Sequence, residues 1–167
     1  MYRTLEDFLT HWKQEAAMTE QVFDMLTDES LNQQITSENR TLGRLGWHLT
    51  TTIGEMMSHT GLEFEATPED LPVPNSAKEI ADAYRMSSKA MVQALQEQWT
   101  DDTLQEERNM YGENWTITQV LTTLVMHQTH HRAQMTVLMR QAGLKVPGLY
   151  GPAMEDWAAM GAPVPKV

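Results

Sequence analysis

The sequence predicts an all-α protein, a four-helix bundle, and three observations support this prediction. Four segments carry apolar residues at the spacing of an amphipathic helix, at about 4–27, 41–61, 76–99 and 116–142. The segments between them are polar or rich in proline and glycine. Alternation typical of a strand does not persist anywhere, although 109–115 has the composition of a brief hairpin. Long amphipathic helices with little other structure bury their apolar stripes against one another in a bundle.

Each predicted helix has its own evidence. The first two are indicated by apolar stripes, which comprise Leu5, Phe8, Leu9, Trp12, Ala16, Val22, Phe23 and Leu26 in one and Leu42, Leu45, Leu49, Ile53 and Met56 in the other. The third and fourth begin at apparent capping boxes, Ser76 with Glu79 and Thr116 with Gln119. Gly143 is placed to end the fourth helix.

The connections and the tail complete the prediction. The connections before the third and fourth helices are long enough to cross the bundle, so a simple up-down-up-down order is not required. After Gly143 the chain is rich in glycine and proline, and it has room for one short helix at 153–160. We predict a single domain over residues 1–167.

The composition and charge of the chain argue against several classes of function. The formal net charge is −11, with no cluster of lysine and arginine, so we expect no nucleic-acid partner. No apolar run is long enough to span a bilayer, and the N-terminal residues do not resemble a signal peptide, so we expect no membrane association and a cytoplasmic location. The chain has no cysteine, which excludes disulfides, thiolate ligands and a protein thiol nucleophile.

Three of the six histidines lie in the run MHQTHHRAQ of the fourth predicted helix. Each residue advances an α-helix by about 100°, so His131 lies about 40° from His127, within the apolar stripe, and His130 lies about 60° to the other side. His127 and His131 therefore face the interior one turn apart, which is how a helix presents two imidazoles to one metal ion. On spacing alone, two histidines with ordinary hydrogen-bond partners remain the alternative.

A third ligand has to come from another helix. His48 in the second predicted helix is the best candidate, because it lies beside the apolar stripe and falls at the depth of His131 if the two helices are antiparallel. A closed structural site normally has four protein ligands, so three imidazoles indicate a catalytic site with an open position.

The chain resembles the DinB-like family, which includes YfiT-type putative metal-dependent hydrolases and bacterial thiol transferases. The resemblance covers most of the chain and depends on GWHLTTTIGE in the second predicted helix, on HQTHHRAQ in the fourth and on the Gly-Pro-rich tail. The family pattern has HHRGQ, and here Ala133 replaces its glycine. The resemblance implies an up-down-down-up bundle, a metal triad at His48, His127 and His131, a nickel- or zinc-like divalent ion and frequent dimers.

Two further residues are candidates for catalysis. Glu55 lies seven residues after His48, so a carboxylate on nearly the same flank is available to orient an imidazole or accept a proton; a solvated glutamate is the alternative. His130 is the other candidate, with a surface role as its alternative. Gln128 takes the place of the general-base glutamate of His-Glu-x-x-His metalloproteases, which argues against peptidase chemistry. We assign Arg132 and Gln134 to helix solvation and packing.

These observations leave three functions open, all with a small-molecule substrate. We rank first a metal-dependent enzyme that transfers a low-molecular-weight thiol, such as bacillithiol, to a small electrophile. A hydrolase that activates water on the metal comes second, and a non-catalytic metal-containing binding module comes third. A homodimer is also predicted, through the flank of the fourth helix that carries Met126, Ala133 and Val137.

Overall fold

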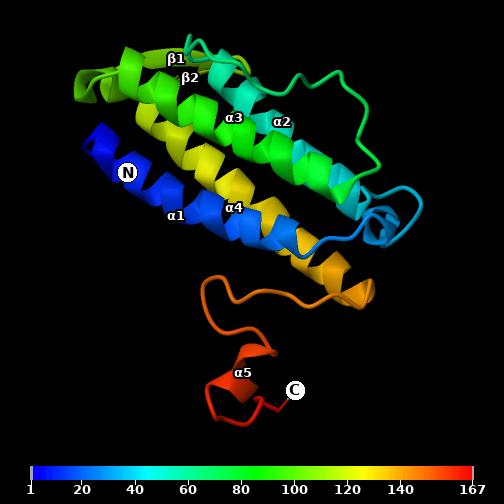
Figure 1. Cartoon of the computed structure of the whole chain (residues 1–167). Coiled ribbons are helices and arrows are strands. Elements are labelled where there is room, and N and C mark those ends of the chain that lie inside the picture. Colours follow the sequence, from blue (N-terminus) through cyan, green and yellow to red (C-terminus); the bar gives the residue numbers. More distant parts are fainter. Residues whose placement is uncertain (1, 167) are drawn as a thin grey trace.

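A computed structural model of the chain, which describes residues 2–166, is mostly helical (Figure 1). Its four long helices are α1 (Leu5–Asp24), α2 (Leu42–Ser58), α3 (Ala77–Gln98) and α4 (Ile117–Gln141). Each begins one residue after its predicted start and ends one to three residues before its predicted end. The apolar periodicity therefore located all four helices.

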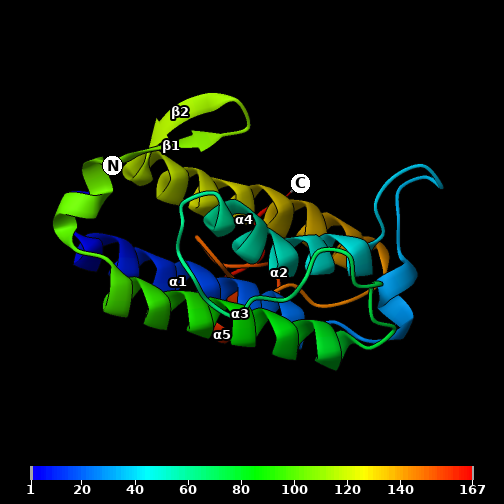
Figure 2. The same ribbon diagram turned by 90° about the horizontal axis from the view of Figure 1, so that it is seen from above.

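The long helices pack side by side around one apolar core. α1 packs against α3 and α4, and α2 packs against the same two helices. Figure 2 shows the result from above, with α1 and α3 along one side and α2 and α4 along the other. α2 and α3 run in one direction and α1 and α4 in the opposite direction, and the connection from α2 to α3 returns along the length of the molecule (Figure 1).

Helix ends follow the sequence signals in most respects. The capping box of Thr116 and Gln119 is complete, whereas at Ser76 only one half forms, in which Ser76 Oγ accepts from the backbone N–H of Glu79. Gly143 has φ of +74° and ends α4 in a Schellman motif, because its N–H donates to Arg140 and the next N–H donates to Met139.

The prediction of an all-α protein is wrong at one point. Strands β1 (Glu107–Met110) and β2 (Glu113–Thr116) form an antiparallel hairpin between α3 and α4. Tyr111 and Gly112, the two residues of the turn, both have positive φ, as a type I′ turn requires. Met110 is fully buried and attaches the hairpin to the core. Four-residue strands are too short for alternation to be visible in the sequence, which predicted pairing only as a brief possibility at 109–115.

Shorter elements fill the connections and the tail. Two 3₁₀ turns, η1 (Glu29–Asn32) and η2 (Asp101–Gln105), precede α2 and the hairpin. The predicted helix at 153–160 is reduced to α5 (Asp156–Ala159), which buries none of its residues. No helix within residues 2–166 has the length and hydropathy needed to cross a membrane.

The flank of α4 predicted to contact a second copy is uncovered in the monomer. Met126 and Val137 are 65% and 54% exposed, and Ala133 is exposed between them. α4 packs against α1 and α2, so these three side chains are not needed to cover a neighbouring helix. The homodimer stays a prediction.

Thr116→Ala should lower the free energy of unfolding by about 1 kcal/mol, because it removes the oxygen that accepts from the Gln119 N–H at the start of α4. Thr10→Ala is the matched control, since Thr10 is exposed within α1, where alanine has the higher helix propensity. Urea unfolding should give changes of opposite sign for the two variants. Equal changes would show that the cap contributes nothing.

Candidate metal centre

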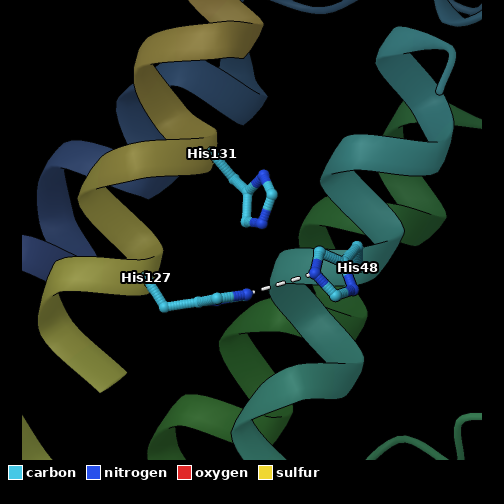
Figure 3. Close-up of side chains that lie close together, drawn as sticks. All are labelled: His48, His127 and His131. Carbon is cyan, nitrogen blue, oxygen red and sulfur yellow. Dashed lines mark hydrogen bonds between the residues drawn. The ribbon is translucent and has the colours of Figure 1, made fainter. Parts of the chain in front are cut away.

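Three histidines from two helices point their rings toward one another. His48 lies on α2, and His127 and His131 lie on consecutive turns of α4 (Figure 3). Each offers one ring nitrogen, and these three atoms lie within 4.8 Å of one another. Nε2 of His48 is 3.2 Å from Nε2 of His127, and the three pairs of ring centroids are 4.5–4.9 Å apart. The structure thus brings together the predicted triad.

A buried amide sets the spacing between the two helices. Gln128 is fully buried, and its Nε2 donates to the backbone carbonyl of Leu49 at 2.9 Å. Gln128 and Leu49 directly follow His127 and His48 in the sequence. The bond therefore holds the two histidines at the same depth. It also directs the Gln128 side chain into the helix interface, where it cannot act on a substrate.

Hydrogen bonds at the outer nitrogens orient two of the rings. His131 Nδ1 lies 2.7 Å from Oε1 of Gln134, an acceptor, so Nδ1 carries the proton and Nε2 has its lone pair free. The Thr52 hydroxyl donates to the carbonyl of His48 and lies 3.3 Å from His48 Nδ1, so it accepts from that nitrogen in the same way. Gln134 was predicted only to pack or be solvated; its position three residues after His131 is the signal for this contact.

The environment keeps the imidazoles neutral. Burial lowers the pKa of His48 to about 3 and that of His127 to about 4, with smaller contributions from nearby positive charges, including Arg40. The pKa of His131 is also lowered, mainly by burial. Neutral imidazoles have the free lone pairs that a metal ion requires.

The spacing between His48 and His127 fits a shared divalent ion. Two imidazole nitrogens bound to one tetrahedral ion at 2.0–2.1 Å lie about 3.3 Å apart, close to the 3.2 Å between His48 and His127. A donor set of nitrogens alone suits zinc, nickel or another transition metal better than magnesium or calcium.

Of the two candidate catalytic residues, Glu55 lies apart from this cluster, whereas the ring centroid of His130 is 4.8 Å from that of His131. Both carboxylate oxygens of Glu55 accept from the Tyr111 hydroxyl, and the same carboxylate lies 3.4 Å from His59 Nε2. It makes no hydrogen bond or ion pair with the triad. His130 is exposed, and its Nε2 lies 3.1 Å from Nε2 of Gln134, on the outer side of α4. Neither residue is among the three that converge.

The structure differs most from the sequence-based prediction in the environment of Arg132. This residue was assigned to helix solvation and packing, yet it is only 1% exposed. Its guanidinium donates to Glu15 and Thr19 on α1 and to the hydroxyl of Tyr150 in the tail. Burial of an arginine requires such partners, and a partner 117 residues away in sequence is not visible from local spacing. Arg132 therefore joins α4 to α1, whereas Gln128 joins it to α2.

A cavity lies beside the triad, and a larger groove lies away from it. A cavity of about 350 Å³ has His131 and Gln134 on its wall, together with Arg40 and Asn39. A larger groove of about 870 Å³ lies between α1 and α3 and includes no triad residue. Because chemistry at an ion requires a substrate beside it, the smaller cavity is the candidate substrate site.

The fold and the site define a mostly helical protein with a three-histidine candidate metal centre. The model of the DinB family matches residues 1–165, and the chain belongs to this family. It is 54% identical over 167 residues to the uncharacterized protein YrdA of Bacillus subtilis (strain 168), with 100% of both chains covered.

Two solved structures of DinB-like proteins have a similar fold. A crystal structure of a DinB-like protein from Bacillus cereus ATCC 10987 is 51% identical, with a TM-score of 0.87, and the match covers 90% of this chain and 100% of that one. A second, the DinB-like protein YjoA of Bacillus subtilis, is 17% identical, with a TM-score of 0.67 and coverage of 89% and 99%. This more distant likeness shows the shared fold alone.

The metal-free protein should lose stability as the pH falls from about 7.5 to 5.5. The folded pKa values of His48 and His127, about 3 and 4, lie below the ordinary value of 6.5, so the unfolded chain binds more protons in this window. Urea unfolding of His127→Gln should show a shallower dependence on pH. A dependence that is equal in the two proteins, or a metal-free protein that gains stability on acidification, would contradict these pKa values.

Proposed function

We propose that the chain is a metal-dependent enzyme that transfers a low-molecular-weight thiol, such as bacillithiol, to a small electrophile. The observation that carries this proposal is the convergence of His48, His127 and His131, whose ligand atoms lie within 4.8 Å of one another. No carboxylate joins this group within residues 2–166. Three protein ligands leave a coordination position open, which is typical of catalytic rather than structural sites.

The ligand set favours nickel or zinc as the physiological ion. A bound divalent ion supplies Lewis acidity, which lowers the pKa of a thiol or of water in the open position. The residues of the chain have simpler roles. The three imidazoles hold the ion without adding charge, while Thr52 and Gln134 keep the outer nitrogens of His48 and His131 occupied.

Thiol transfer is favoured over hydrolysis because no carboxylate of residues 2–166 joins the three ligand nitrogens. The position of the metalloprotease glutamate is held by Gln128, which is buried in the helix interface, and Glu55 is bound to Tyr111. A metal-activated thiol needs no base as strong as the one that activates water. The chain has no cysteine, so the thiol has to come from solution. A hydrolase that activates water is the second candidate.

We also propose that the four long helices form the up-down-down-up bundle of the family. The antiparallel directions of α2 and α4 in Figure 1 support it. In this packing the bond from Gln128 to Leu49 sets the depth of a histidine on each helix. The bundle and the proposed metal centre therefore depend on the same packing.

Protein purified without a nickel column should contain, or bind on titration with nickel or zinc, one ion per chain. His127→Ala should weaken metal binding by more than about 100-fold, since loss of a ligand costs more than loss of a group that orients one. His130→Ala, three residues further along the same helix, is the matched control and should retain the metal. Elemental analysis and calorimetry measure both effects. Metal retained by His127→Ala would exclude this site.

Metal-loaded protein should convert a model electrophile only when a thiol such as bacillithiol is supplied, and chelation should abolish the reaction. The physical reason is that the thiol attacks as a thiolate, whose population the ion raises at neutral pH. The assay follows loss of the electrophile by chromatography. Ester or amide cleavage without thiol would instead support the hydrolase, and a metal-dependent melting temperature with no turnover in either panel would support a binding module.

A further inference from the structure

We propose that the site selects substrates carrying a carboxylate or phosphate group, which Arg40 and Arg44 bind beside the three histidines. This inference deepens the proposed function, because it names the charge of the molecule that would occupy the cavity next to the triad. Three observations outside the histidine cluster support it. The two arginines have no carboxylate partner within residues 2–166, they lie at the start of α2, and Arg40 lines the cavity beside the triad.

The first observation is the pairing of arginines in an acidic chain. Five of the seven arginines form ion pairs, namely Arg3 with Asp7, Arg85 with Glu20, Arg108 with Glu106, Arg132 with Glu15 and Arg140 with Glu155. Arg40 and Arg44 have no carboxylate within 4.0 Å in residues 2–166, although the chain has 23 acidic residues and 12 basic ones. Guanidinium groups without a protein partner are available to an anionic ligand.

The second observation is that both arginines occupy unfavourable positions for stability. Arg40 directly precedes Thr41, the N-cap of α2, and Arg44 lies in the first turn. The partial positive charge at a helix N-terminus favours acidic residues there, and α1 and α3 both carry them in their first turns. α2 has no acidic residue in its first turn. Two cations at this helix start gain nothing from the helix, which indicates a role in binding.

The third observation is that Arg40 borders the cavity beside the triad. The cavity of about 350 Å³ has Arg40 and Asn39 on one side and His131 and Gln134 on the other. The rest of its lining is apolar, formed by Ile35, Leu45, Val137 and Leu138. Arg44 lies four residues before His48 on α2, so the two side chains are neighbours on one face of that helix, one turn apart.

These features fit a small molecule with one anionic group and a short hydrocarbon portion. A cavity of this size accepts a small molecule, and its apolar lining favours a short hydrocarbon portion. An anionic group paired with Arg40 would place the remainder of that molecule against His131 and therefore at the open coordination position. The formal charge of −11 repels anions from the molecule as a whole, so this local positive charge provides selectivity that the rest of the surface does not.

The test compares 3-mercaptopropionate with its methyl ester, because the two share a thiol and differ by one negative charge. Calorimetry on zinc-loaded protein should show the acid binding about tenfold more tightly or better, as expected for a charge-assisted hydrogen bond. Arg40→Gln and Arg44→Gln should each reduce this preference, and the double variant should abolish it. Arg3→Gln is the matched control, since it removes the same charge ahead of α1 and should keep the preference.

A second arm separates the source of the anion, and a third separates this inference from the metal centre. Inorganic phosphate that displaces the acid at similar concentration would show recognition of phosphate as well as carboxylate. Metal-free protein, followed by ligand-detected NMR, should bind both probes more weakly but keep the preference for the acid. If no metal binds but the preference persists, only the metal centre fails. Equal affinity for acid and ester, or a preference unchanged in the double variant, would overturn the anion site.

Discussion

The bond from Gln128 to the carbonyl of Leu49 is the contact on which the site depends. It is a buried hydrogen bond between α4 and α2, and each partner directly follows a histidine of the triad. A shift of one helix along the other would leave the Gln128 amide unpaired in the core, at a cost of roughly 1–3 kcal/mol. The same shift would move His48 away from His127. The depth at which the two helices pack and the separation of the two imidazoles are therefore set together.

α4 is held on two sides by buried polar groups. Gln128 joins it to α2, and Arg132, four residues later, joins it to Glu15 and Thr19 on α1. His127 and His131 point from α4 toward His48 on α2 (Figure 3). Rigid support on both sides is what a metal site requires, because ligand nitrogens have to be held at their distances before the ion arrives. Burial then keeps His48 and His127 neutral, at the expense of stability at low pH.

Much of this arrangement follows from local sequence. Apolar periodicity located all four long helices, and the i, i+4 spacing of His127 and His131 with the position of His48 predicted which imidazoles would converge. The parts that sequence reasoning missed depend on contacts between distant segments. The partner of Arg132 lies on α1 and that of Gln128 lies on α2. The lack of a carboxylate partner at Arg40 and Arg44 is recognisable only once the other five arginines have theirs. The hairpin was predicted only as a brief pairing at 109–115, because its strands are four residues long and its turn depends on positive φ at Tyr111 as well as Gly112.

The central claim is that three imidazoles from two helices bind one divalent ion. X-ray absorption spectroscopy at the metal edge of protein loaded with one equivalent of zinc or nickel tests it most directly. We predict three imidazole nitrogens at roughly 2.0–2.1 Å for zinc, with the multiple scattering typical of histidine rings and one or more lighter ligands from solvent. An environment of oxygen ligands alone, or one with a single imidazole, would show that the ion binds elsewhere and that the histidine cluster is not a metal centre.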